Sequence, residues 1–174
     1  MFKRKLIMGI FEINDSIDKF KLLVKQYEHY KNKQLSTDTA VSFFETAWSL
    51  TEWVGKEFGG VVTQNDLGIF RNALYPRCPH LKVLHDISNM SKHMTLSKPK
   101  SSISKTGKQT GPFSSAFTMQ FQSTSLVIEL EDGTIYQVND MIDEVLDFWN
   151  YYFKNDLQIP NERLSIKLED LFDN

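Results

Sequence analysis

Polar side chains that could form a reactive site recur along one predicted helix at the spacing of a single face. Four of them lie three or four residues apart, which places them on one side of an α-helix: Lys82, Asp86, Asn89 and His93. An imidazole titrates near neutral pH, so His93 could act as a general acid or base. Lys92 could stabilise negative charge that develops on phosphorus. The pattern predicts a candidate site for phosphodiester chemistry at His93, Asn89 and Lys92.

The same helix face also fits a role without catalysis. Its opposite side carries Leu81, Leu84 and Ile87, as expected for an amphipathic helix that packs on a core. A polar stripe opposite such a core is commonly a solvated surface, and a partner protein can contact such a surface. The hypothesis of an interaction face uses the same four residues, namely Lys82, Asp86, Asn89 and His93.

Residues 88–93 read Ser-Asn-Met-Ser-Lys-His, which resembles the R-N-x-x-x-H motif of HEPN-type domains. Ser88 stands where that family has its arginine, so Asn89 and His93 are the matching positions. HEPN-type domains are helical bundles, often dimeric, and many are metal-independent ribonucleases of toxin–antitoxin, anti-phage and CRISPR systems. The resemblance implies a helical bundle and a homodimer. A catalytic arginine would then come from across the bundle or the dimer, with Arg71 and Arg77 as candidates.

Charge is distributed unevenly along the chain. The net charge is −2, but residues 91–112 hold five lysines and no acidic residue, and residues 113–174 sum to −9. A basic strip can bind nucleic-acid phosphates, and an acidic face can bind a basic partner. The two segments can also neutralise each other within the fold or across a dimer. Four lysines are the candidate nucleic-acid contacts: Lys98, Lys100, Lys105 and Lys108.

Composition narrows the remaining classes of protein. Hydrophobic residues make up 41% of the 174 residues and charged residues 24%, which is typical of a globular chain. The one cysteine, Cys78, excludes an internal disulfide and a multi-cysteine metal site, and we expect no cofactor and no metal. Apolar runs are shorter than the roughly 18 residues of a membrane span. We expect residues 1–11 to belong to the folded chain rather than to a signal peptide, and we expect a cytoplasmic protein.

Hydrophobic periodicity predicts an α+β fold. Four amphipathic helices are expected over about residues 11–31, 38–58, 65–75 and 79–94, forming a bundle over 1–95. A lysine-rich loop is expected over 96–116. Residues 117–174 are expected to form strands at 117–122, 126–130 and 134–138, with a turn at Asp132 and Gly133, followed by helices at 141–154 and 161–172. We expect these parts to pack as one compact domain.

Three functions fit these observations. The first is a non-catalytic protein-interaction module of HEPN-like shape, with a partner from a bacterial or phage defence, toxin–antitoxin or counter-defence system. The second is a metal-independent ribonuclease that uses His93 with Asn89 and Lys92. The third is a small RNA- or DNA-binding protein that uses the lysines of residues 98–108. Binding ranks above catalysis because the motif arginine is missing.

Overall fold

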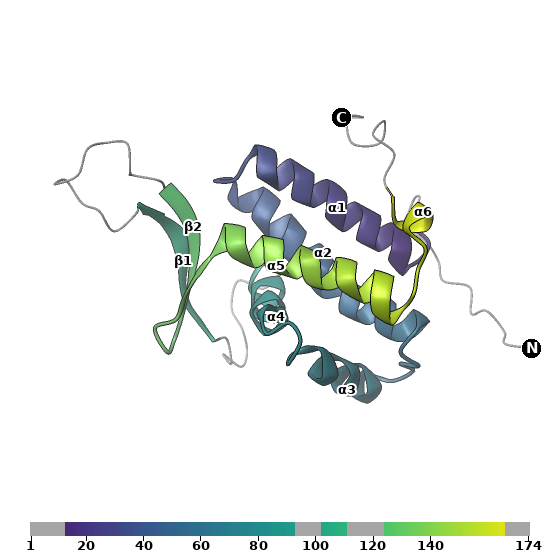
Figure 1. The fold of residues 1–174 in the computed structure, drawn as a ribbon. Helices are drawn as coiled ribbons and strands as arrows, with labels where there is room; N and C mark the ends of the chain where they lie inside the picture. Colours follow the sequence, from purple (N-terminus) through teal and green to yellow (C-terminus); the bar gives the residue numbers. More distant parts are fainter. Residues whose placement is uncertain (1–12, 93–101, 111–123, 166–174) are drawn as a thin grey trace, which may run out of the picture.

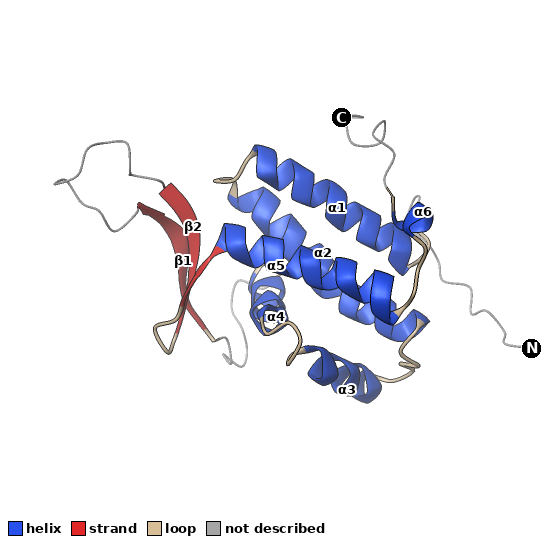
Figure 2. Ribbon diagram, in the orientation of Figure 1, coloured by secondary structure: helices blue, strands red, loops and turns tan. Residues whose placement is uncertain are grey.

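The computed structural model describes residues 13–92, 102–110 and 124–165. Four helices come first: α1 (Ser16–Asn32), α2 (Thr37–Glu57), α3 (Gln64–Leu74) and α4 (His80–Met90). Three strands follow: β1 (Ile103–Thr110), β2 (Thr124–Leu130) and β3 (Ile135–Gln137). The chain ends in α5 (Val138–Tyr151), a π-helical turn (Tyr152–Asp156) and α6 (Asn161–Leu164). Helices and an antiparallel sheet occupy separate regions (Figures 1 and 2), which confirms the predicted α+β class.

The centre of the helical bundle is α2, which contacts α1, α3, α4 and α5. Phe43, Ala47, Leu50 and Val54 recur along it at three- and four-residue intervals and are all fully buried. This spacing is the apolar stripe that predicts the helix expected over about residues 38–58. Burying one such large side chain contributes about 2 kcal/mol to stability, so α2 anchors the other helices.

Local signals explain where the helices begin and end. At the start of α3, the Thr63 hydroxyl accepts a hydrogen bond from the Asp66 N–H, and the Asp66 carboxylate accepts one from the Thr63 N–H. After α2, Gly60 has a φ of 67°, a left-handed conformation that glycine adopts without strain. The sequence predicts that this helix ends at about residue 58, and the structure confirms it, since α2 ends at Glu57.

The sheet has the order β1-β2-β3, and both pairs of strands are antiparallel. The predicted hairpin between β2 and β3 is confirmed, with Gly133 at a φ of 84° in its turn. In contrast, β1 lies inside the segment 96–116, which the sequence predicts as a loop. Seven of its eight residues are exposed, so it shows no alternation and is held by its ladder with β2. The predicted strand at 117–122 and the end of the predicted helix 161–172 lie outside the described residues.

The inner face of the sheet joins the core, while its far end extends beyond the helices. Leu126 and Ile128 of β2 are buried, and Tyr136 of β3 lies opposite Ile128 on the same face. This face packs against α5, as a two- or three-stranded sheet requires for stability. The far ends of β1 and β2 project beyond the bundle (Figure 1).

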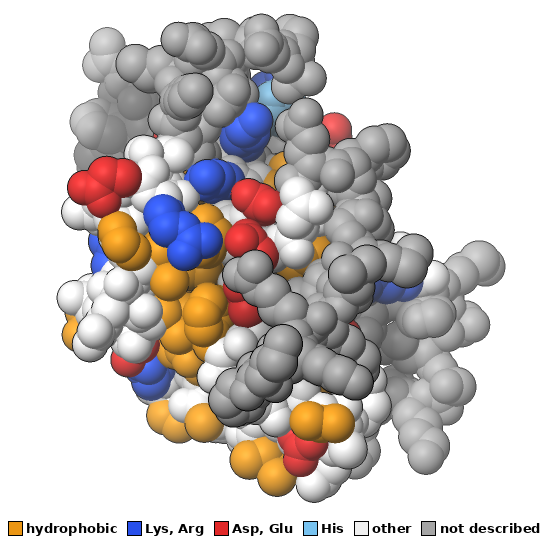
Figure 3. Space-filling view, turned by 90° about the vertical axis from the view of Figure 1, so that its right-hand side faces the viewer, with side chains coloured by type: hydrophobic (Ala, Val, Ile, Leu, Met, Phe, Trp, Pro, Cys, Tyr) orange, Lys and Arg blue, Asp and Glu red, His pale blue; other side chains and the backbone are white. Residues whose placement is uncertain are grey.

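Apolar surface is exposed on the opposite end of the molecule. Figure 3 shows hydrophobic side chains that gather near the middle of this end, with Lys, Arg, Asp and Glu side chains around them. Phe58 and Val62, which follow α2, are 42% and 85% exposed. The two ends of the molecule therefore differ, because the sheet end presents strand backbone and this end presents apolar side chains.

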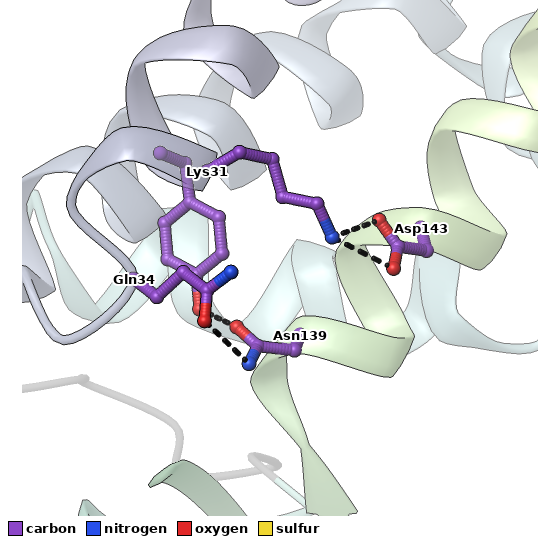
Figure 4. Close-up of polar contacts among 5 residues, drawn as sticks. Lys31, Gln34, Asn139 and Asp143 are labelled. Carbon is purple, nitrogen blue, oxygen red and sulfur yellow. Dashed lines mark hydrogen bonds and ion pairs between the residues drawn. The ribbon is translucent and has the colours of Figure 1, made fainter.

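Polar contacts fasten the end of α1 to the start of α5 (Figure 4). Lys31 Nζ lies 3.0 Å from both carboxylate oxygens of Asp143, and Asn139 Nδ2 donates to Gln34 Oε1 at 3.4 Å. The Tyr30 hydroxyl donates to Asn139 Oδ1. Burial and the nearby Asp143 charge raise the pKa of Tyr30 to about 12, so its hydroxyl stays protonated and can keep donating.

Replacing Tyr30 with phenylalanine is expected to lower the free energy of unfolding by about 1 kcal/mol, because Asn139 loses its hydrogen-bond donor. Urea unfolding followed by circular dichroism measures this change. The matched control is Tyr151→Phe, which removes a hydroxyl from a side chain that is 56% exposed and should have no measurable effect. Equal losses in the two variants would contradict the role of the Tyr30 contact.

Candidate functional site

The predicted site on α4 falls only partly within the described residues. His93, Lys98 and Lys100 lie outside them. Lys92 lies in the turn after α4 and is exposed, and Asn89 lies on α4 itself. The structure therefore places Asn89 and Lys92 at the end of α4, and the role of His93 stays a prediction.

One residue of the predicted interaction face has another role. Asp86 Oδ2 accepts hydrogen bonds from the backbone N–H of Ser102 at 2.8 Å and from its hydroxyl at 2.9 Å. The side chain of Asp86 is only 13% exposed. Asp86 thus ties the residue before β1 to α4, so it positions the sheet rather than presenting its carboxylate to a partner.

The other polar residues of α4 contact aromatic rings of the neighbouring helices. The His85 ring lies 4.9 Å from the Trp48 ring of α2, and His85 Nε2 is 3.0 Å from Asn89 Nδ2. Lys82 Nζ lies 5.3 Å from the centre of the Tyr75 ring, just after α3. These contacts turn the polar side of α4 toward α2 and α3.

Ser88, which aligns with the motif arginine, lies on the buried side of α4. It is 1% exposed, and its hydroxyl oxygen is buried without a hydrogen-bond partner in the described part of the chain. Leu84 and Ile87 share this side of the helix. Position 88 therefore points into the bundle, whereas Asn89 is turned toward the surface.

The two candidate arginines have different surroundings. Arg77 forms an ion pair with Asp156, with Nη2 and Oδ2 2.7 Å apart, and lies over the Tyr152 ring. The guanidinium of Arg71 instead lies 4.1 Å above the Trp48 ring, and its Nε donates to the Thr51 hydroxyl at 2.8 Å. Of the two arginines, Arg71 therefore lies near α4, because its guanidinium contacts the same Trp48 ring as His85.

Burial acts directly on the Arg71 guanidinium. Desolvation lowers the pKa of Arg71, and the nearby Tyr75 and Glu52 oppose this shift. Within the described residues, Arg71 forms no ion pair with a carboxylate. The sequence did not predict that Arg71, Trp48 and His85 lie together, because these residues come from three different helices. A half-buried guanidinium without an acidic partner was not predictable from residue spacing.

The two lysines of β1, Lys105 and Lys108, are both exposed. Lys105 pairs with Glu129 and Lys108 pairs with Leu126 in the ladder with β2. Since side chains alternate along a strand, Lys108 shares the face of Leu126 and Lys105 lies on the outer face. The structure therefore directs these two predicted nucleic-acid contacts to opposite faces of the sheet.

The backbone of β1 has hydrogen-bonding groups that β2 does not use. The N–H of Leu130 donates to the carbonyl of Thr134, so Leu130 faces β3 and the preceding residue, Glu129, faces β1. Backbone groups alternate sides along an antiparallel strand, and Lys105 opposite Glu129 therefore faces β2. It follows that Thr106, and every second residue after it, turns its N–H and C=O away from β2. Among the described strands none lies on that side.

The geometry does not favour thiol or metal chemistry in the described part of the chain. Cys78 is buried, and desolvation raises the pKa of its thiol to about 11, so it is not an activated thiolate. No group of three or more His, Cys, Asp or Glu side chains is arranged to hold a metal ion in residues 13–92, 102–110 and 124–165. No helix in these ranges is both long and apolar enough to cross a bilayer.

The fold and the site place the chain among α+β proteins with a helical bundle and a projecting antiparallel sheet. Comparison of the chain with protein-family models, with curated proteins and with solved structures found no match.

Proposed function

We propose that this protein is a non-catalytic interaction module that binds a partner protein by strand addition to β1. The observation that carries this proposal is the outer edge of β1, where backbone donors and acceptors face away from β2 and no other described strand pairs with them. An exposed edge strand is a template for pairing with another chain, and here the residues that face outward are Thr106, Lys108 and Thr110. Main-chain hydrogen bonds from a partner strand would satisfy these groups.

Charge selects the kind of partner strand. β1 contains Lys105 and Lys108 and no acidic residue. Like charges opposite each other destabilise a strand pair, so two β1 edges from two copies of the chain repel. An extended segment with acidic side chains is attracted instead. The partner is therefore a different protein with an acidic segment.

A cavity beside β1 adds a second preference. It has a volume of about 430 Å³ and lies between the sheet and the helices α2 and α4, with Thr106, Phe44 and Ile87 in its lining. In an added strand, side chains alternate between the two faces of the sheet. Every second side chain of the partner would face this apolar lining. The partner segment therefore alternates apolar and acidic residues. The resemblance to HEPN-type domains favours a partner from a defence or toxin–antitoxin system.

The substitution Thr106→Pro tests strand addition directly. Proline removes the N–H that faces away from β2 and leaves the ladder with β2 intact, because edge strands tolerate proline on their free side. A phage-displayed library of random linear peptides, selected on the immobilised full chain, supplies the ligand. We expect the recovered peptides to alternate acidic and apolar residues. We expect Thr106→Pro to weaken the tightest peptide by about tenfold or more in Kd.

The matched control is Thr106→Val, which keeps the backbone N–H and suits a strand. Circular dichroism confirms that both variants are folded. Peptides without acidic residues, or equal affinity of the proline and valine variants for the selected peptide, would reject strand addition at β1.

A further inference from the structure

Arg71 is a half-buried cation that has no acidic partner in the described residues. The Arg71 Nε donates a hydrogen bond to the Thr51 hydroxyl, and the planar face of the guanidinium lies over the Trp48 ring. Within the ranges 13–92, 102–110 and 124–165, its two Nη groups form no hydrogen bond and no ion pair. Desolvating a charge is unfavourable unless an opposite charge compensates it. Trp48 and Thr51 therefore hold a guanidinium in a fixed orientation without neutralising it.

Two further basic side chains lie on the same surface. His85 of α4 lies against the Trp48 ring that Arg71 covers. Lys82, one helical turn earlier on α4, lies over Tyr75, whose hydroxyl is close enough to Arg71 and Asp86 for their charges to act on its pKa. Arg71 of α3 thus shares Trp48 with His85 and lies near Tyr75, which Lys82 contacts, so the basic groups of α3 and α4 surround the same two rings.

The carboxylates near this surface have other partners. Glu52 forms an ion pair with Lys56, and Glu45 accepts a hydrogen bond from the Ser91 hydroxyl. Asp86 is held by Ser102 and lies 3.3 Å from His85 Nδ1. These contacts leave Arg71 and Lys82 as the charges that are not paired with a carboxylate among the described side chains of this surface.

We propose that the surface between α3 and α4 binds a phosphate monoester. The planar fork of Arg71 matches two phosphate oxygens, and its Nε and ring contacts fix the fork in advance. A monoester carries close to two negative charges at neutral pH, which suits the two cations Arg71 and Lys82 better than a single carboxylate does. This site does not involve β1 and is independent of strand addition.

Titration of the full-length protein with inorganic phosphate and with adenosine 5′-monophosphate tests the proposal, with adenosine as the ligand that lacks phosphate. Amide chemical shifts report both affinity and location. We expect both phosphates to shift amides of α3 and α4, and adenosine to leave them unchanged. A short RNA with a 5′-phosphate, compared with the same RNA with a 5′-hydroxyl, distinguishes the end of a nucleic acid from a small molecule as the source of the phosphate.

Arg71→Gln should weaken adenosine 5′-monophosphate binding by about tenfold or more. The matched control is Arg77→Gln, which removes the same charge from a residue paired with Asp156 and should leave affinity unchanged. Lys82→Gln changes only an exposed side chain and should weaken binding by about threefold, so the test holds even if Arg71→Gln unfolds. Absence of phosphate-dependent shifts in the wild type, or equal affinities of Lys82→Gln and Arg77→Gln, would overturn the site.

Discussion

Replacing Ser88 with arginine is expected to unfold the protein rather than to create a ribonuclease. The substitution completes the R-N-x-x-x-H pattern in the sequence, but Ser88 is 1% exposed and lies on the core side of α4. An arginine there would bring a large charged group among apolar side chains. An unpaired buried charge costs several kcal/mol, so we expect a loss of about 4 kcal/mol or more in the free energy of unfolding. That loss is a large fraction of the stability of a typical domain.

Thermal and urea unfolding measure this loss, and Asn89→Arg is the matched control. Asn89 is the next residue on the same helix, is only half-buried and accommodates the new charge near solvent, so its variant should stay folded. A gel assay with labelled RNA measures cleavage by both variants. The same assay is repeated after His93→Ala is added to each variant. A folded Ser88→Arg variant that cleaves RNA, and loses cleavage with His93→Ala, would overturn the expected result and establish the catalytic alternative.

Elements with strong periodicity were predictable from the sequence. The stripe in α2 that contains Phe43, Leu50 and Val54 repeats every three to four residues, and burial of one face enforces that period. The turn at Gly133 was predictable for a different reason, because its positive φ requires glycine. In both cases the structural constraint acts on neighbouring residues, so it produces a pattern that can be recognised in the sequence.

The sequence of β1 shows no pattern that predicts a strand. A strand buried on one face alternates apolar and polar residues, but seven of the eight residues of β1 are exposed. Its lysines and its glycine have the composition of a loop. The strand is stabilised by backbone pairing with β2, which is distant in sequence, and therefore only the folded chain reveals it.

The helix that carries the candidate site was predictable from the sequence, whereas the contacts of its side chains were not. The sequence places Asp86 and Asn89 on one helix face, and the structure confirms that both lie on α4. It does not indicate that Asp86 binds Ser102, which lies beyond the end of the helix, or that Arg71 and His85 share the Trp48 ring. These contacts join separate elements, and helical spacing carries no information about them.

Replacing Asp86 with alanine is expected to release the start of β1 from α4. The carboxylate accepts two hydrogen bonds from Ser102, and without it the Ser102 N–H loses its partner in a half-buried position. Hydrogen bonds to a charged acceptor contribute about 1.5 to 3 kcal/mol each, so the loss of two of them is expected to cost at least about 3 kcal/mol. The strand whose open edge is proposed to bind the partner would then lose its attachment to the bundle.

Urea unfolding gives the size of this loss, and amide hydrogen exchange gives its location. Protection should fall at Lys105 and Gly107, whose backbone groups face β2, while amides in the middle of α2 keep theirs. Ser102→Ala is the matched control, since it removes the hydroxyl donor and keeps the N–H, and it should cost about 1 kcal/mol. The same variants separate two roles for Asp86. If Asp86 contacts the partner itself, Asp86→Ala weakens binding of the selected peptide without loss of protection in β1. If it positions the sheet, binding and protection fall together.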